Sequence, residues 1–360
     1  MPASNTVRRR TVTIHDVALA AGVATSTVSR ALSNPERVRA STREHVGRIA
    51  SELGYLPPSA AKSKSLAAAA EAGPARARRS GTPADGLGVV ALLVPDIGNP
   101  FLTEIIRGSQ RQLAAAGYLQ VLVDTEESGD VEWQTLQKLL GTVDGVVLTA
   151  SRLTDEQLIT VAARVPLVVL NRETPGVAST IVDTPTGFEA LVEHLVSLGH
   201  RSLLYVSGPA ESWSNTRRLA AVQRAGERLG VDVAVTRPFR PTRESGVAAA
   251  DTAINSGATA CIAYNDLLAI GILGRLAERG VAVPAEMSVV GCDDIFGTDF
   301  CSPALTTIAA PIEQAGRAAV SLLLGLFDPS AAPRRQAVTI GTHLVIRHST
   351  GPAPIGGHDA

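Results

Sequence analysis

The chain has 360 residues, which is enough for two or three domains that each bury a sizeable core. Its composition is 45% hydrophobic and 19% charged, which excludes a largely disordered chain, and no run of about 18 apolar residues suggests a membrane span. The net charge of −1 is unevenly spread: residues 1–85 carry 13 Lys and Arg against 6 Asp and Glu, and the remainder carries 20 against 28. A basic N-terminal segment followed by an acidic remainder is typical of a protein whose first domain binds phosphate groups. A basic run that only improves solubility, such as residues 76–79, would account for part of this charge difference.

Residues 1–12 are expected to form a basic arm, and a helix-turn-helix pattern follows at residues 13–32. Thr13 and Asp16 have the spacing of a capping box, which begins a helix. Gly22 supplies a turn, and apolar residues recur at helical spacing on both sides of it. The second helix, at residues 25–32, would point short hydroxyls and an arginine outwards, and a helix of this kind fits the major groove of DNA. On pattern alone, a small amphipathic hairpin without a nucleic-acid role is the alternative.

The run D-V-A-x-x-A-G-V-x-x-x-T-V-S-R-x-L, from Asp16 to Leu32, is followed by Ser-Thr-Arg-Glu at residues 41–44. Together these residues resemble the N-terminal domain of the LacI/GalR (lactose-repressor) family of transcription regulators. The resemblance implies a partner that is a double-stranded, pseudo-palindromic DNA operator. One departure is Ala24, which stands where the family usually has a serine N-cap. The missing cap hydrogen bond lowers the stability of the helix by about 1 kcal/mol unless Thr25 takes over the capping.

By the same resemblance, the candidates for contact with bases in the major groove are Thr25, Ser26 and Arg30. Thr27 and Ser29 are the candidates for contact with phosphate, and Thr13 is assigned to the DNA-binding set with them.

Residues 13–56 are expected to form a three-helix DNA-binding domain, and residues 57–86 a hinge and flexible linker. Family members carry a hinge helix here, which folds on the operator and inserts apolar side chains into the minor groove. Tyr55 and Leu66 are the candidates for DNA contact in this segment. Pro58 replaces the usual Asn, and Lys64 stands where a wedging Leu is expected. Either the register therefore shifts to Leu66 or the insertion is weak.

From residue 87 onwards short apolar runs alternate with helical stretches such as 101–116 and 215–229. The runs that we expect to be buried strands are 89–94, 119–123, 146–149, 167–170, 203–206, 260–263 and 287–291. This alternation predicts an α/β fold with parallel sheets covered by helices on both faces. Two such sets predict two doubly wound lobes that divide near residues 182–185.

This region resembles the periplasmic-binding-protein-like core of the same family as far as about His348. We therefore expect an effector-binding and dimerisation domain at 87–348. Lobe 1 would comprise about 87–183 plus 309–335, and lobe 2 about 184–308 plus 336–348. Residues 349–360 are rich in Gly and Pro and are expected to form a frayed tail.

Ligands of parallel sheets bind at the carboxyl ends of the strands, which here places them between the lobes. The polar and aromatic candidates for effector binding are Asn99, Phe101, Asn171, Trp213, Arg218, Asn265 and Asp293. Asp and Asn can hold vicinal hydroxyls, and an aromatic ring can stack on a sugar face. The preferred effector is a neutral sugar or sugar derivative, and the alternative is a nucleobase or another small metabolite. Asp183 and Asp266 are also candidates for helix N-caps, and Trp213 for the core.

Enzyme functions fit the sequence poorly, because it has no P-loop, no H-E-x-x-H and no G-x-S-x-G motif. Gly86-x-Gly88-x-x-Ala91 imitates a dinucleotide fingerprint but precedes its strand instead of following one. Three cysteines without C-x-x-C spacing predict reduced thiols in a cytoplasmic protein and no metal site. The sequence therefore predicts a homodimeric, effector-controlled repressor of a carbohydrate-use operon, with no cofactor and no membrane partner. The rival from another class is a solute-binding protein of transport, which predicts an export signal and no basic helical head.

Overall fold

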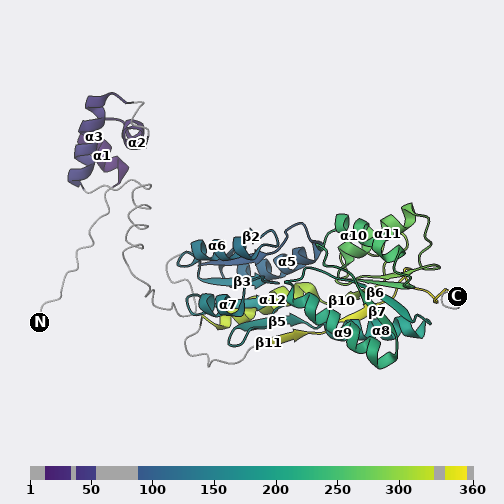
Figure 1. The fold of residues 1–360 in the computed structure, drawn as a ribbon. Helices are drawn as coiled ribbons and strands as arrows, with labels where there is room; N and C mark the ends of the chain where they lie inside the picture. The colour runs from purple at the N-terminus through teal and green to yellow at the C-terminus, as the bar shows by residue number, and fades with distance from the viewer. Residues whose placement is uncertain (1–12, 34–37, 54–87, 328–336, 355–360) are drawn as a thin grey trace, which may run out of the picture. The chain divides into compact units, whose positions relative to one another are not determined.

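The computed structural model describes residues 13–33, 38–53, 88–327 and 337–354 (Figure 1). The chain divides into two compact units, Met1–Ala77 and Arg78–Ala360. Within the described residues no helix is both long and apolar enough to span a membrane.

The first unit contains the helices α1 (Ile14–Ala21), α2 (Thr25–Ser33) and α3 (Ala40–Leu53), each packed against the other two. The capping box at the start of α1 is confirmed: the Thr13 amide donates to Asp16 Oδ2 at 2.8 Å, and Thr13 Oγ1 accepts from the Asp16 amide at 3.4 Å. Gly22 ends α1 in the left-handed conformation, with φ of 65°, which a residue without Cβ adopts at little cost. Small and β-branched residues fill the core between the helices: Val17, Ala18, Ala21, Val28, Ala31, Val46 and Ala50.

The first lobe of the second unit is a parallel sheet in the order β11-β5-β4-β3-β1-β2. Its strands are β1 (Gly88–Val94), β2 (Tyr118–Asp124), β3 (Gly145–Thr149), β4 (Leu167–Leu170), β5 (Ala178–Val182) and β11 (Ala337–Ile340). Helices α5 (Pro100–Ala115) and α12 (Ile312–Gly325) cover one face. Helices α6 (Gly129–Leu139) and α7 (Asp155–Ala162) cover the other.

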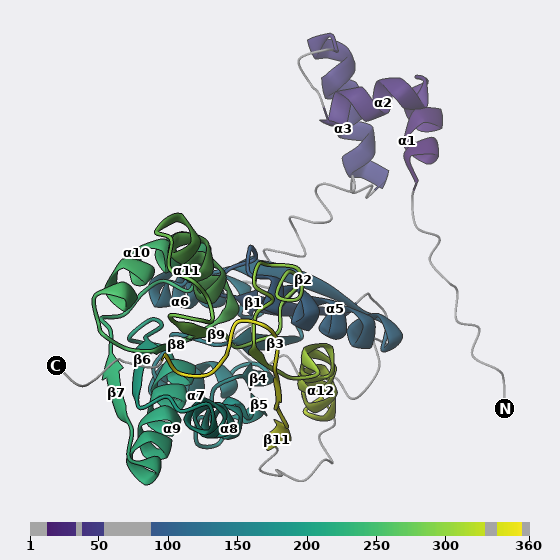
Figure 2. The same cartoon turned by 90° about the vertical axis from the view of Figure 1, so that its right-hand side faces the viewer.

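The second lobe is a smaller parallel sheet in the order β7-β6-β8-β9. Its strands are β6 (Ser202–Val206), β7 (Asp232–Val235), β8 (Ala260–Ala263) and β9 (Ser288–Val290). Helices α8 (Thr184–Ser197) and α9 (Trp213–Leu229) lie side by side on one face, and α10 (Arg243–Ile254) and α11 (Asp266–Glu278) on the other (Figure 2). The short strands β10 (Thr307–Ala309) and β12 (His343–Val345) pair antiparallel.

Each strand predicted from the sequence is present within one residue of its expected ends, and both lobes are doubly wound as expected. Strand β11 differs from the prediction, which placed residues 336–348 in lobe 2. It pairs in parallel with β5, with Val338 opposite Thr180, and so belongs to the first lobe's sheet. An edge strand of four residues with two exposed side chains carries too little apolar pattern for the sequence to reveal its partner.

The expectation of a frayed tail is wrong for residues 349–354, the part of it that the structure describes. Ser349 is fully buried, and its Oγ donates to the Val289 carbonyl at 2.6 Å and accepts from the Thr306 amide at 2.8 Å. The Gly351 amide donates to Ser288 Oγ at 3.1 Å. Glycine and proline predict irregular backbone, but the hydrogen bonds that fix such backbone come from strands distant in sequence.

Candidate functional site

A cavity lies between the two lobes, at the carboxyl ends of both parallel sheets. The first lobe lines it with Pro95, Asn99, Phe101, Leu102, Glu127, Ala150, Arg152 and Asn171. The second lobe lines it with Ser214, Arg218, Pro241, Tyr264, Asn265 and Asp293. Ser214 Oγ donates to the Asn171 carbonyl at 3.5 Å, a long bond that joins the two walls. Six of the seven predicted effector residues therefore come together in one place; their contact with an effector remains a prediction.

The wall of the second lobe is organised by Arg218, which projects from α9 and is 4% exposed. Its Nη2 donates to Asp293 Oδ1 at 3.2 Å, its Nη1 to the Tyr264 carbonyl at 2.7 Å and its Nε to Thr184 Oγ1 at 3.3 Å. The guanidinium also lies 4.6 Å from the centre of the Tyr264 ring. Burial raises the pKa of Asp293, and the positive charge of Arg218 opposes that shift. The pair thus compensates two charges that would be costly to bury separately.

A second ion pair, between Glu127 and Arg152, stands in the wall of the first lobe. Arg152 Nε donates to Glu127 Oε2 at 3.0 Å, Nη2 adds a further bond to the same oxygen, and Nη1 donates to the Ala150 carbonyl at 3.0 Å. The two side chains are 7% and 16% exposed. The sequence analysis did not single out either residue. Their position directly after the strands β2 and β3 was the available signal, since that is where the cleft had to form.

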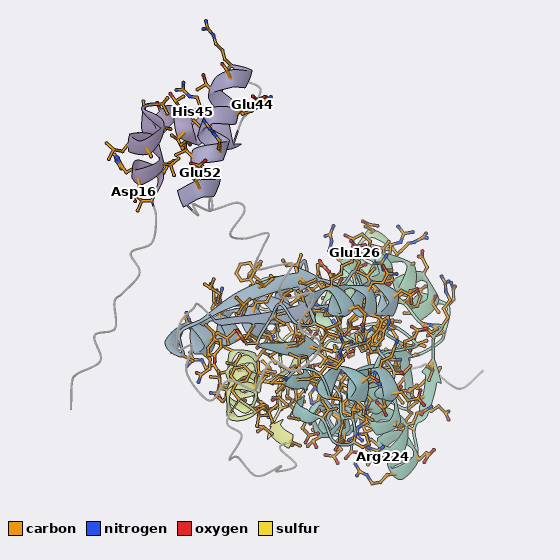
Figure 3. All side chains as sticks on the ribbon, turned by 90° about the vertical axis from the view of Figure 1, so that its left-hand side faces the viewer. Asp16, Glu44, His45, Glu52, Glu126 and Arg224 are labelled. Atoms are coloured by element: carbon orange, nitrogen blue, oxygen red, sulfur yellow. The ribbon has the colours of Figure 1, made fainter. Side chains whose placement is uncertain are left out.

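The backbone at the cleft is unusual. Within the described residues, all non-glycine residues with positive φ lie in the loops that follow β2, β3, β4 and β9: Glu126, Glu127, Ala150, Asn171, Asp293 and Asp294. Figure 3 labels Glu126 on one of these loops. Such conformations cost of the order of 1 kcal/mol or more each and tend to gather where a ligand is held. Asn171 is stabilised in this conformation because its Oδ1 accepts from the Val182 amide at 3.0 Å.

Three predicted residues also cap helices. Asn99 is the N-cap of α5, with Oδ1 accepting from the Phe101 amide at 3.1 Å, and Asp183 is the N-cap of α8, as expected. Asn265 is the N-cap of α11, with Oδ1 accepting from the Leu268 amide at 3.1 Å. Asp266, the residue suggested for that cap, is instead fully buried behind the cleft.

Trp213 is the predicted effector residue that the cleft does not include. It is the first residue of α9 and half-buried, and its ring centre lies 5.2 Å from the guanidinium carbon of Arg217. A stacking role on an effector in this cavity therefore has no geometric support.

The DNA-binding candidates lie mainly on α2. Ser26, Ser29 and Arg30 are exposed on this helix, and Thr25 and Thr27 are partly so. Helix α2 begins at Thr25, and the Ala24 carbonyl accepts from the Val28 amide at 3.2 Å. Thr13 is engaged in the capping box of α1, and Tyr55 and Leu66 lie outside the described residues.

The charges of the first unit favour α2 as the surface that meets DNA. Helix α3 exposes Glu44, His45 and Glu52 (Figure 3) together with Arg43 and Arg48, so its two negative charges offset its two arginines. The sequence of α2 contains Arg30 and no acidic residue. A helix with hydroxyls, one arginine and no carboxylate is suited to a groove lined by phosphates.

A helix-turn-helix unit with a hydroxyl- and arginine-bearing α2, joined to a two-lobed domain with a polar cleft, is typical of one class, the ligand-controlled DNA-binding regulators. Comparison with known proteins supports this: residues 13–58 match the family model for bacterial regulatory proteins of the lacI family, and residues 192–350 match that for the periplasmic binding protein-like domain. The HTH-type transcriptional repressor CytR of Escherichia coli (strain K12) is 32% identical over 351 residues, which cover 95% of this chain and 97% of the relative.

Solved structures of transcription regulators have the same fold as this chain. The lac repressor dimer bound to operator and the anti-inducer ONPF has a TM-score of 0.68 at 27% identity, covering 95% of this chain and 100% of that chain. The complex of the transcriptional regulator CelR with cellobiose has a TM-score of 0.66 at 27% identity, covering 94% of this chain and 99% of that chain. The chain belongs to the LacI family and is a helix-turn-helix transcription regulator. The resemblance identified in residues 16–44 is thereby confirmed.

Proposed function

We propose that the protein is a homodimeric repressor of a carbohydrate-use operon and that a small, uncharged sugar or sugar derivative in the cleft controls its binding to a pseudo-palindromic operator. The observation that carries the effector class is the pairing of charges in the cleft. The charged residues that line it form two neutral pairs, one from each lobe.

This pairing favours an uncharged, hydrogen-bonding ligand over an anionic one. A phosphorylated metabolite would have to take Arg152 or Arg218 from its carboxylate and leave a buried Glu127 or Asp293 without compensation. A polyhydroxylated ligand instead exchanges hydrogen bonds with both partners of each pair and with the amides of Asn99 and Asn171. The complex of CelR with cellobiose shows that a relative of this fold binds such a ligand.

Arg30 and its neighbours on α2 are the groups that we propose to read the operator. Two copies of α2 in a two-fold dimer would meet two half-sites about one helical turn of DNA apart. An effector that binds more tightly to one arrangement of the lobes changes operator affinity, and operator binding then changes effector affinity by the same factor.

The test of the effector class is the thermal stability of the purified full-length protein with a panel of cellobiose, ribose, nucleosides, purines and sugar phosphates. A compound present at about 100 times its dissociation constant adds about 2.7 kcal/mol of stability, which shifts the melting temperature measurably. A shift with a neutral sugar supports the proposal. A shift with a purine or nucleoside alone would assign the other effector class, and a shift with sugar phosphates alone would contradict the argument from paired charges.

A further inference from the structure

Asp266 is a buried carboxyl that the proposed ligand contacts do not use. It is the first residue of α11 and is fully buried, but it does not line the cleft. Asn265 already caps the helix, so capping does not explain the carboxyl. Within the part of the chain that the structure describes, no Lys, Arg or His forms an ion pair with it. Burying a carboxyl group without an ion-pair partner costs free energy, and only hydrogen bonds can offset that cost here.

The two oxygens of Asp266 hold two different segments. Oδ1 accepts from Thr307 Oγ1 at 2.6 Å, and Oδ2 accepts from the Ile295 amide at 3.0 Å. Ile295 belongs to the loop that carries Asp293 into the cleft. Thr307 is the first residue of β10, the strand that leaves the second lobe for α12 in the first. The carboxyl group thus bridges the cleft loop and a connection between the lobes.

The same loop is bonded directly to this connection along its length. The Gly291 amide donates to the Thr306 carbonyl at 3.0 Å, and the Asp293 amide to the Ile308 carbonyl at 2.9 Å. The lack of a side chain at Gly291 makes room for the Asp266 carboxyl group, because a Cβ at this position would lie 2.0 Å from Asp266 Oδ1. The loop, the strand and the carboxyl group are therefore built as one packed unit, which we call the Asp266 clamp.

We propose that Asp266 is a positioning residue, which holds the Asp293 loop against the interlobe strand β10 so that a displacement of Asp293 in the cleft is passed to the connection between the lobes. The inference rests on the proposed function in one respect, since it takes Asp293 to face the effector. It adds the contacts through which a ligand in the cleft would displace the connection that leads to the first lobe.

The charges around the clamp decide which substitution preserves it. Burial raises the pKa of Asp266, the carboxylates of Asp293 and Asp294 add to this rise, and the bonds from Thr307 and Ile295 oppose it, which together place the pKa at about 7. Arg218 compensates Asp293, and Arg347 donates to Asp294 Oδ1 at 2.8 Å. Asparagine can reproduce both contacts of a neutral Asp266, because its oxygen can accept from Ile295 while its nitrogen donates to Thr307 Oγ1.

The experiment is amide hydrogen exchange on the full-length protein without added ligand, which makes it independent of the effector. In Asp266→Ala we expect amides of residues 293–295 and 306–308 to exchange about tenfold faster together, while β6 keeps its protection. Asp266→Asn should stay close to the wild type. Thr259→Ala, which removes a bond to His200 elsewhere in the second lobe, is the control and should leave both segments unchanged.

Unchanged protection of residues 293–295 in Asp266→Ala would overturn the proposal, as would a uniform loss of protection over the second lobe in both Asp266 variants. Failure of the proposed effector class has a different signature. In that case the sugar panel produces no shift, while the exchange pattern of the clamp is unaffected.

Discussion

Arg218 shows how a single residue in the cleft acquires its geometry. Its three hydrogen-bond partners, Thr184, Tyr264 and Asp293, come from the start of α8, the residue after β8 and the loop after β9. A guanidinium with five donors in a fixed plane can satisfy such a set, and lysine cannot. The protein's own groups therefore hold the guanidinium in place, which lowers the cost of binding an effector.

At the residue scale, Asp293→Asn should weaken binding of the compound found in the thermal-shift panel by about tenfold, equivalent to about 1.4 kcal/mol. The substitution keeps the shape of the side chain and its ability to lie in the left-handed region, where Asp293 has φ of 120°, but removes the charge that compensates Arg218. Isothermal titration measures the change. Asp299→Asn, an exposed carboxyl in the same loop, is the control, and equal affinity in both variants would mean that Asp293 has only a structural role.

Arg30→Ala should reduce the preference for a duplex selected by the wild type from random sequences, relative to unselected DNA, by about 1–3 kcal/mol. Arg48→Ala removes the same charge from the exposed surface of α3 and should lower binding to both duplexes alike. Fluorescence anisotropy at fixed salt gives both affinities. An unchanged preference in Arg30→Ala would place the reading surface elsewhere.

At the scale of elements, α10 and α11 approach so closely that two positions in their contact, Gly246 and Gly271, have no room for a Cβ. A Cβ on Gly271 would lie 2.1 Å from the Arg243 carbonyl oxygen, and a Cβ on Gly246 would lie 2.3 Å from that of Leu268. The helix pair covers one face of the second sheet, and α11 carries Asn265 and Asp266 at its start. The spacing of this pair therefore helps to fix the position of the cleft wall.

Gly271→Ala should destabilise the protein by about 1–3 kcal/mol, because the helices must separate to admit the methyl group. Gly274→Ala lies one turn further along the same helix, where nothing is within 4 Å of the added atom. That variant should be neutral or up to about 1 kcal/mol more stable, since alanine favours the helix. Denaturant unfolding of both variants measures the difference. Equal stabilities would contradict the close packing of α10 and α11.

At the scale of the whole binding domain, His200 joins the second sheet to the end of the described chain. It is fully buried; its Nδ1 lies 2.8 Å from Thr259 Oγ1, and its Nε2 lies 3.1 Å from both Ser288 Oγ and the Gly351 carbonyl. Burial lowers the pKa of His200, the bond to Gly351 opposes this shift, and His194 adds to it. The folded protein thus prefers the neutral ring.

A group of this kind contributes stability that is present above its unfolded pKa of about 6.5 and is lost as the pH falls below that value, because the unfolded chain then binds the proton more readily. We expect His200→Gln to be less stable than the wild type at pH 8 and to lose less stability than the wild type between pH 7 and pH 5. Denaturant unfolding at pH 8, 7 and 5 measures the free energy of unfolding of each protein. His343→Gln, an exposed histidine, should follow the wild type, and parallel curves for all three proteins would show that His200 does not titrate in this way.

The sequence by itself determined the local structure and the general location of the site. Thr13, Asp16 and Gly22 act on neighbours within a few residues, so the first helix and its turn were predictable. The apolar runs predicted the strands, and the rule that ligands bind at their carboxyl ends brought Asn99, Arg218 and Asp293 to one cleft.

Only the tertiary structure decided which groups meet. Glu127 pairs with Arg152 across two loops, β11 joins β5 across more than 150 residues of sequence, and Ser349 is buried against Val289. It also decided that Asn265 caps α11 while Asp266 is buried as a bridge to Thr307. Hydrogen bonds and ion pairs between distant segments depend on packing in three dimensions, and neither residue type nor spacing along the chain encodes which of several polar neighbours becomes the partner.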